Sequence, residues 1–402
     1  MSIKVVIGAN FGDEGKGLMT DYFASRTNKG IVVRFNGGAQ AGHTVVLPDG
    51  HRHVFGHFGS GTLQGLPTYL SKHFVVNPMI FCKELDRLQT KMSVLPNVYI
   101  DLRSAVTTPY DIMLNQMVEK LRGNNKHGSC GLGFNETIVR QDWVPLTVRD
   151  LCDFKNLVQT LNIIRNHYLP IRLQQLGIKS IPSEFETLIG NDNVAIRYIQ
   201  DIERMFEFTQ LGDQDILKNF DDIVFEGAQG LMLHQRHGFF PYVTRSNTGI
   251  ENVIEVLEEA SLIQPMEVCY VTRAYLTRHG AGPFLTEIPV KPYKRIIDLT
   301  NVPNPYQGTL RFGLLDIDIL EQTISNDLLL ASAYNNFISP SLAVTCVDQL
   351  DDRAHFYWNT ELKDYHIYDF LEVLFSIPRI KNGYISKGMT RETIRCSNLL
   401  WG

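Results

Sequence analysis

The stretch Ile3-Lys-Val-Val-Ile-Gly-Ala-Asn-Phe-Gly-Asp-Glu-Gly-Lys-Gly17 decides the first unit of the fold. Its β-branched run over 3–8 predicts a strand, and the apolar spacing over 18–24 predicts a helix after the loop. A strand that leads into glycines and a helix N-terminus offers backbone N–H groups and the positive end of a helix dipole to a ligand. Lys16 adds a positive charge. We therefore expect this loop to bind an anion.

The loop departs from the Walker A pattern of phosphate-binding loops. No glycine stands five residues before Gly15, and Gly17 replaces the Ser or Thr whose hydroxyl would bind Mg²⁺. Asp13 and Glu14 would repel phosphate unless one of them holds a metal or acts as a base. The alternative is an ordinary glycine-rich turn with solvated charges.

A second predicted strand, over 30–36, also ends in a glycine-rich polar loop, Gly37-Gly-Ala-Gln-Ala-Gly-His-Thr44. Two such units indicate an open, mainly parallel sheet that binds ligands at the carboxyl ends of its strands. If the two loops are neighbours, Asp13 and His43 form a carboxylate and imidazole pair that can move protons. A structural role for a lone histidine is the alternative.

The rest of the chain predicts more of the same architecture. The stretch 151–211 is periodic and helical in pattern, and we interpret it as a helical excursion whose helices pack on their own domain rather than on a partner. Further strands are predicted over 74–76, 98–101, 222–225, 267–271 and 342–345, and helices over 81–95, 110–122 and 249–263. Motifs spread from Asp13 to Arg391 favour one large domain covering 1–402.

Composition excludes several classes of protein. The chain has 402 residues, of which 44% are hydrophobic and 20% charged, as in ordinary globular enzymes. Its net charge of −5 and its lack of a basic run argue against nucleic-acid binding. The six cysteines are scattered, and the N-terminal apolar run is too short for a signal peptide or a membrane span. We expect a cytoplasmic enzyme that binds neither nucleic acid nor membrane.

Two later segments carry groups suited to a nucleotide. Phe225-Glu-Gly-Ala-Gln-Gly230 follows a predicted strand, and Thr244-Arg-Ser-Asn-Thr248 follows soon after. Their hydroxyl, amide and backbone donors suit a phosphate or a base edge. Taken together, the segments 12–17, 36–44, 225–230, 241–248 and 277–287 resemble the adenylosuccinate synthetase family in sequence and in order, with weaker similarity over 345–348 and 386–393.

The resemblance implies an α/β fold like that of P-loop NTPases and a two-step ligation. The γ-phosphate of GTP moves to O6 of a 6-oxopurine nucleoside monophosphate, and the amine of L-aspartate then displaces it. By resemblance, Asp13 would accept the N1 proton and help hold Mg²⁺ together with the Gly42 carbonyl. His43 would stabilise charge at O6 and on the phosphoryl group, and Lys16 would neutralise the phosphates.

The resemblance also implies nucleotide contacts and a homodimer. Gln229 would contact the purine, Thr244 the 5′-phosphate, and Asp348 the guanine N1 and N2, with Ser386 and Gly388 nearby. Arg140 would reach a nucleotide phosphate across the dimer interface, with a solvated surface arginine as the alternative. The other nucleotide-binding or phosphate-binding residues implied are Gly12, Gly15, Gly17, Gln40, Ser129 and Arg311.

The chain departs from the family pattern at several places. Only Arg311 remains of an arginine-rich loop that serves aspartate, and Cys346 replaces a lysine of the guanine-reading motif, so ATP is an alternative to GTP. The loops 127–133, 249–252 and 304–308 are similar to a phage branch that uses dGMP, which would place the enzyme in the host cytoplasm. Asp13 is the residue of the IMP-using enzymes, yet a carboxylate can accept from both N1–H and the 2-amino group of guanine. IMP and dGMP both remain candidate substrates.

Two other functions compete with a ligase. A catalytically silent purine-nucleotide sensor would have no need of Asp13, Lys16 and His43 together. A GTPase-like switch is disfavoured because the first loop fails the Walker A pattern.

Overall fold

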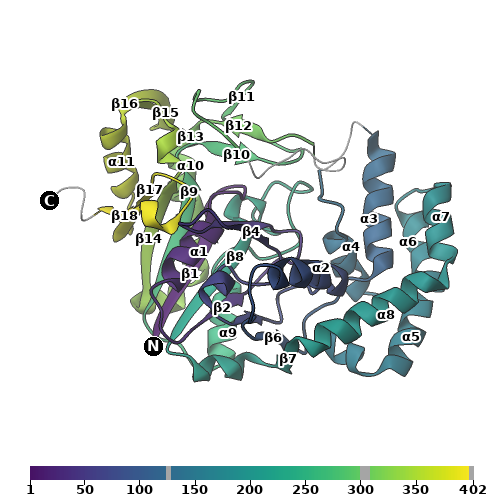
Figure 1. Cartoon of the computed structure of the whole chain (residues 1–402). Coiled ribbons are helices and arrows are strands. Elements are labelled where there is room, and N and C mark those ends of the chain that lie inside the picture. Colours follow the sequence, from purple (N-terminus) through teal and green to yellow (C-terminus); the bar gives the residue numbers. More distant parts are fainter. Residues whose placement is uncertain (124–127, 299–307, 398–402) are drawn as a thin grey trace.

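A ten-stranded sheet forms the centre of the computed structural model, which describes residues 1–123, 128–298 and 308–397 (Figure 1). The strand order is β18-β17-β14-β9-β1-β8-β2-β5-β6-β7, and neighbouring strands run parallel except β17 and β18. The strands are β1 (Ser2–Gly8), β2 (Gly30–Arg34), β5 (Thr68–Leu70), β6 (Val98–Asp101), β7 (Thr209–Gly212), β8 (Asp222–Gly230), β9 (Met266–Arg273), β14 (Ile338–Thr345), β17 (Asn382–Ser386) and β18 (Ile394–Cys396). The mainly parallel α/β sheet expected from the sequence is confirmed.

The order of the strands decides where a ligand can bind. From β1 the chain builds one half of the sheet through β2, β5, β6 and β7, and β8 then returns between β1 and β2. The second half grows from β9 on the other side of β1. In open parallel sheets, the loops diverge at such a reversal and leave a crevice at the carboxyl ends of the strands. The crevice is therefore expected beyond β1, β8 and β9.

Helices cover the sheet and extend it on one side. In Figure 1, α3 and α4 and the helices α5 to α8 gather on the side away from the C-terminal elements. The helices are α1 (Lys16–Ala24), α2 (Pro78–Gln89), α3 (Pro109–Arg122), α4 (Phe134–Gln141), α5 (Phe154–Ile163), α6 (Leu169–Gln175), α7 (Ser183–Gly190), α8 (Asp192–Glu207), α9 (Glu251–Glu259), α10 (Ile317–Leu330) and α11 (Ile367–Phe375). Small sheets pair β3 (His43–Val46) with β4 (Arg52–Phe55), β12 (Arg311–Gly313) with β10 (Leu276–Arg278) and β11 (Glu287–Ile288), and β15 (Arg353–Trp358) with β13 (Leu315–Asp316) and β16 (Glu361–His366).

The helical excursion is present and packs on its own domain. Leu157 of α5 and Ile202 of α8 share one buried cluster with Phe81 of α2 and Val98 of β6. The expected range 151–211 runs slightly too far, because it ends inside β7, which pairs with β6 at the edge of the sheet.

Some expected elements have different bounds. In the expected strand 74–76, only Val75 and Val76 pair, each in an isolated bridge, and the sheet strand of this region is β5. The helix expected over 81–95 begins at Pro78, because the side chain of Asn77 accepts the backbone N–H of Ile80 (3.2 Å) and caps it. No helix in the described ranges is long and apolar enough to cross a membrane.

A buried carboxylate holds the turn that follows β4. Glu84 of α2 accepts the backbone N–H groups of Gly56 (3.0 Å) and His57 (2.7 Å). Burial by itself raises the pKa of Glu84, but the His53 and His57 side chains, each with a ring nitrogen 3.7 Å from the carboxylate, and the backbone N–H of His57 outweigh it and lower this pKa to about 2. Glu84 is therefore ionised in the folded protein.

We predict that Glu84→Gln lowers the free energy of unfolding at neutral pH by about 3 kcal/mol, since the folded pKa lies below the unfolded one. A carboxyl with a lowered pKa stabilises the fold above its unfolded pKa, and this contribution disappears as the pH falls toward the folded pKa. Urea unfolding of wild type and variant at several pH values should show the difference shrinking in acid. The exposed Glu258→Gln serves as the control, and a difference independent of pH would contradict the assignment.

Candidate functional site

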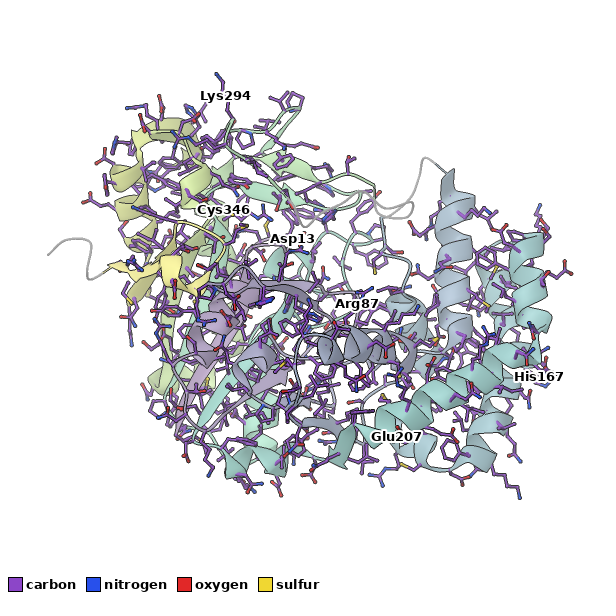
Figure 2. The ribbon with its side chains drawn as sticks, viewed as in Figure 1. Asp13, Arg87, His167, Glu207, Lys294 and Cys346 are labelled. Carbon is purple, nitrogen blue, oxygen red and sulfur yellow. The ribbon has the colours of Figure 1, made fainter. Side chains whose placement is uncertain are left out.

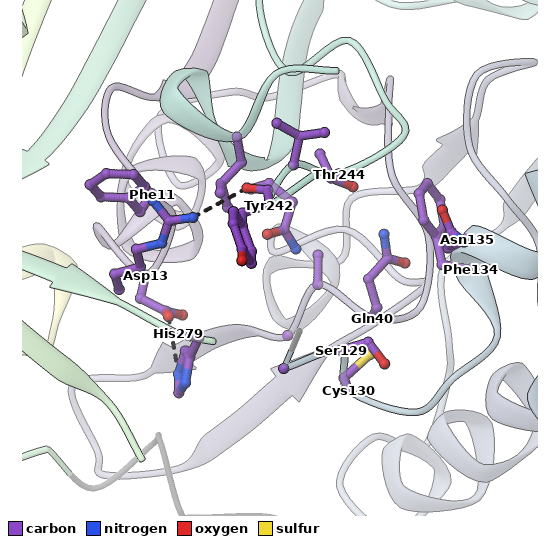
Figure 3. A pocket seen from close by; sticks show the side chains of 18 of the residues that line it. Phe11, Asp13, Gln40, Ser129, Cys130, Phe134, Asn135, Tyr242, Thr244 and His279 are labelled. Atoms are coloured by element: carbon purple, nitrogen blue, oxygen red, sulfur yellow. Dashed lines mark hydrogen bonds and ion pairs between the residues drawn. The ribbon is translucent and has the colours of Figure 1, made fainter. Parts of the chain in front are cut away.

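A cleft of about 520 Å³ lies beyond the carboxyl ends of β1, β8 and β9. Figure 3 shows Asp13 and His279 at one end of it and Ser129, Cys130 and Asn135 at the other. Segments far apart in the chain meet here, and Figure 2 places Asp13 near the middle of the molecule. The residues expected from the sequence that line the cleft are Gly12, Asp13, Gly15, Lys16, Gly17, Gln40, Gly42, His43, Ser129, Gln229 and Thr244.

Glu14 keeps the first loop in shape. Its Oε1 accepts the backbone N–H groups of Asn10 (3.0 Å) and Gly12 (2.8 Å), and its Oε2 lies 2.8 Å from Nζ of Lys16. Both charged side chains are buried. Glu14 thus uses its charge inside the loop, where it holds backbone groups and the lysine in place.

Asp13 is presented to the cleft from the same loop. It has a left-handed backbone conformation (φ 61°), and its carbonyl oxygen accepts Nε–H of Arg273 at the end of β9 (2.5 Å). Its side chain is 30% exposed, and Oδ2 lies 3.3 Å from Nε2 of His279 (Figure 3). Arg273 therefore fixes the backbone of Asp13, and His279 contacts its carboxylate.

Gly15 and Gly17 open the N-terminus of α1. Gly15 has φ 95°, and no side chain caps the helix after it. A Cβ at Gly17 would lie 3.1 Å from the Cβ of His43 and 3.0 Å from the carbonyl oxygen of Thr44. Glycine in place of the Walker A hydroxyl residue therefore lets β3 approach the helix, and His43 reaches the first loop.

His43 is paired with a glutamate that sequence reasoning did not assign as its partner. Nδ1 of His43 lies 2.6 Å from Oε1 of Glu226, and Glu226 also accepts the hydroxyl and the backbone N–H (2.9 Å) of Ser60. Arg34 lies 3.9 Å from the same carboxylate. The only sequence signal for Glu226 was its place at the end of a predicted strand, within 225–230.

Burial and the neighbouring charges shift the pKa values of both Glu226 and His43. Burial by itself raises the pKa of Glu226, but His43 and Arg34 outweigh it and lower this pKa to about 2. Burial lowers the pKa of His43, although Glu226 acts against that shift. An anionic Glu226 holds Nδ1–H of a neutral imidazole, and Nε2 of His43 has no partner among the described residues. Asp13 and His43 thus share the cleft, each with a partner of its own.

The other loops of the cleft are tied together by Asn36. Its amide donates to the carbonyls of Ala228 and Asn247 (both 3.0 Å) and accepts the N–H of Ala228 (2.7 Å).

Two polar groups of the second loop are left unpaired. Nε2 of Gln40 and Oγ1 of Thr44 are buried without a partner among the described residues. Buried polar groups are almost always paired, so unpaired ones in a cleft indicate a ligand.

The roles expected for Arg140, a phosphate contact or a solvated surface position, are wrong. It is completely buried on α4, where Nε lies 3.0 Å from Oδ1 of Asp111 and the other nitrogens donate to the carbonyls of Val144 (2.8 Å) and Val106 (2.6 Å). The physical reason is Asp111, a buried carboxylate that caps α3 and needs a partner. Neither a phosphate contact nor a solvated surface position fits this environment.

Arg311 also lies outside the cleft lining. Its Nε donates to Glu287 (2.7 Å), and Nη1 donates to the carbonyls of Gly280 and Gly282 (both 3.0 Å). It therefore supports the loop that carries His279. Two of the loops on which the expected similarity to the phage branch rests lie partly outside the described residues. These are residues 304–307 of the loop 304–308 and His127 of the loop 127–133.

The expected base-reading residues stand together at the next strand ends. Asp348 follows β14, Ser386 ends β17, and these two strands are parallel neighbours. Asp348 is exposed, and the hydroxyl of Ser386 donates to the carbonyl of Gly388 (2.9 Å). Oγ1 of Thr345 donates to the carbonyl of Glu14 (2.7 Å) and joins this edge to the first loop. Asp348, Ser386 and Gly388 do not line the cleft described above, and their role stays a prediction.

Comparisons with known proteins agree on one family. A family model described as adenylosuccinate synthetase matches residues 5–351. The adenylosuccinate synthetase of Thermoplasma volcanium is 31% identical over 328 residues, which cover 80% of this chain and 72% of that protein. The enzyme of Borrelia turicatae is 32% identical over 337 residues, 81% of this chain and 74% of its own.

Solved structures share the fold. The fully ligated adenylosuccinate synthetase from Plasmodium falciparum matches with a TM-score of 0.75 at 19% identity, over 98% of this chain and 99% of that one. The cyanophage S-2L succinoaminodeoxyadenylate synthetase, bound to dGMP and dATP, matches with a TM-score of 0.61 at 14% identity, over 98% and 95%. By its sequence matches, the chain belongs to the adenylosuccinate synthetase family and is a ligase that forms C–N bonds.

Proposed function

We propose that this chain ligates L-aspartate to a 6-oxopurine nucleoside monophosphate, IMP or dGMP, at the expense of GTP or ATP. The observation that carries the proposal is the meeting of Asp13, Lys16 and the His43–Glu226 pair in one cleft. A carboxylate and an imidazole in separate hydrogen-bonded settings can act on different atoms of one substrate. A binding module has no need of that arrangement.

The proposed steps follow from these contacts. Asp13 has one carboxylate oxygen on His279 and keeps the other for the N1 proton of the purine, so that O6 becomes nucleophilic. Nε2 of His43 carries a lone pair while the imidazole is neutral, so it must gain a proton before it can donate to O6 and the phosphoryl group. Glu226, which acts against the shift caused by burial, stabilises that imidazolium. An ammonium has three donors, so Lys16 can bind phosphate while it keeps its bond to Glu14. O6 takes the γ-phosphoryl group of the triphosphate, which leaves as the diphosphate. The amine of L-aspartate then attacks C6, and inorganic phosphate leaves with O6.

The residues present fit the expected Mg²⁺. The ion prefers oxygen ligands and takes only one or two carboxylates from a protein, with phosphates and water as the rest. Asp13 and the Gly42 carbonyl line the cleft and supply such oxygens. When bound, Mg²⁺ would neutralise charge on the transferring phosphoryl group.

We further propose that Asp348 reads the base of the triphosphate, and that the enzyme works as a homodimer.

We predict that purified protein with Mg²⁺, L-aspartate and a triphosphate converts its purine to a succinylated product that absorbs to the red of the substrate. A panel of IMP, dIMP, GMP and dGMP, each with GTP and with ATP, identifies both substrates by initial rates. A preference for dGMP would assign the 2-aminoadenine route and a preference for IMP the general purine route. Nucleotide binding without any turnover would instead support the sensor.

We also predict that Asp13→Ala and His43→Ala each abolish measurable turnover while binding of the monophosphate stays within about tenfold, as expected of groups that act in the transition state. Steady-state rates and calorimetric titration measure the two effects. Equal and mild losses of turnover in both variants would point to structural roles.

Replacing the partner of His43 should be nearly as damaging. Glu226→Gln should lower kcat by about 100-fold or more, because the amide holds the imidazole in the catalytic orientation less well. Glu267→Gln is the matched control, since Glu267 lies near the start of β9, at the edge of the sheet away from the cleft, where it binds Lys4 (2.7 Å). Unchanged kcat in Glu226→Gln would remove the pair from the mechanism.

A further inference from the structure

Arg245 is a cation of the cleft that lies within the segment 244–248 but has no role assigned to it so far. It is exposed, lines the cleft and directly follows Thr244, which also lines it. Among the residues that the structure describes, Arg245 makes no hydrogen bond or ion pair.

The other strong cations of the cleft already have partners in the protein. Lys16 is bound to Glu14 (2.8 Å), and Arg122 to Glu119 (2.7 Å). Arg273 donates to the Asp13 carbonyl, and Arg278 donates to three backbone carbonyls, those of Pro283, Tyr242 and Ala281. Arg245 therefore has the one uncommitted guanidinium of the described cleft lining.

The carboxylates near the far end of the cleft are neutralised. Glu119 is paired with Arg122, and Glu136 with Arg172 of α6 (2.8 Å). Neither of these carboxylates is paired with Arg245, whose charge stays available to an anion in the cleft. With Arg140 buried against Asp111, this end of the cleft otherwise lacks a free cation among the described residues.

The backbone on both sides of Arg245 is fixed, although its side chain is free. The N–H of Thr244 donates to the carbonyl of Leu233 (2.9 Å), and the hydroxyl of Ser246 accepts the N–H of Gly37 (3.2 Å). The carbonyl of Ser246 accepts the N–H of Gln235 (3.2 Å). A rigid base therefore presents a planar fork of donors, which matches the geometry of phosphate oxygens.

We propose that Arg245 binds the 5′-phosphate of the nucleoside monophosphate, in the place where the sequence pointed to Arg140. The inference deepens the function proposed above and rests on it. Arg245 supplies charge and paired N–H donors, and the Ser129 and Thr244 hydroxyls complete the phosphate site. It takes no part in the chemical step.

The test compares Arg245→Gln, Arg245→Lys and wild type. Arg245→Gln should weaken binding of the preferred monophosphate, and raise its KM, by about 10- to 100-fold, the value of a charged hydrogen-bonded contact. The kcat should stay near that of wild type, and Arg245→Lys should recover part of the loss. Binding of the matching nucleoside, which lacks the phosphate, should not change. Arg353→Gln, an exposed arginine of β15 outside the cleft, is the control.

Calorimetric titration with the monophosphate alone separates this inference from the ligase proposal. A wild type that binds the monophosphate through Arg245 but never ligates it would sink the ligase and keep the phosphate contact. An unchanged Kd in Arg245→Gln overturns the inference. It is equally overturned if the variant raises the KM of L-aspartate or of the triphosphate and leaves that of the monophosphate alone.

Discussion

The shape of the cleft depends on the buried carboxylate of Glu226. It stands in the middle of β8, opposite Arg34 at the end of β2, and binds His43 of β3, Ser60 and, at 3.9 Å, Arg34 itself. A buried carboxylate is tolerated only when its oxygens are well paired. Folding therefore fixes all of these groups together, and His43 enters the cleft with one ring nitrogen bound and the other left for a ligand.

Most other charged groups of the cleft are also paired within the protein. Glu14 is bound to Lys16, Asp13 to His279, and Glu119 to Arg122 within the protein. A protein with a net charge of −5 can thus hold polyanionic ligands without a broad basic surface. Binding then relies on backbone N–H groups, hydroxyls and a few charges at fixed places, which favours selectivity over general attraction.

The parts of this site that could be predicted from the sequence are those determined locally. The first loop is an example, because a strand, a glycine-rich turn with Gly15, Lys16 and Gly17, and a helix follow one another within a few residues. An anion-binding helix N-terminus is predicted from that order alone. The parts that could not be predicted depend on which buried group faces which. Glu226 is 183 positions from His43, and Arg140 is buried because Asp111, 29 positions away, needs a partner. Charge type alone carries no information on such pairings.

The helical excursion, α5 to α8, supports one wall of the cleft. Arg172 of α6 binds Glu136 at the start of α4, and the hydroxyl of Tyr198 of α8 donates to the carbonyl of Thr107 before α3 (3.0 Å). Asn115 of α3 donates in turn to the hydroxyl of Ser129 (2.8 Å). The excursion therefore fixes α3 and α4, and these hold the loop at the far end of the cleft. The strand ends of the sheet form the end that carries Asp13, so the distance between the two ends is set by how the excursion packs against the sheet.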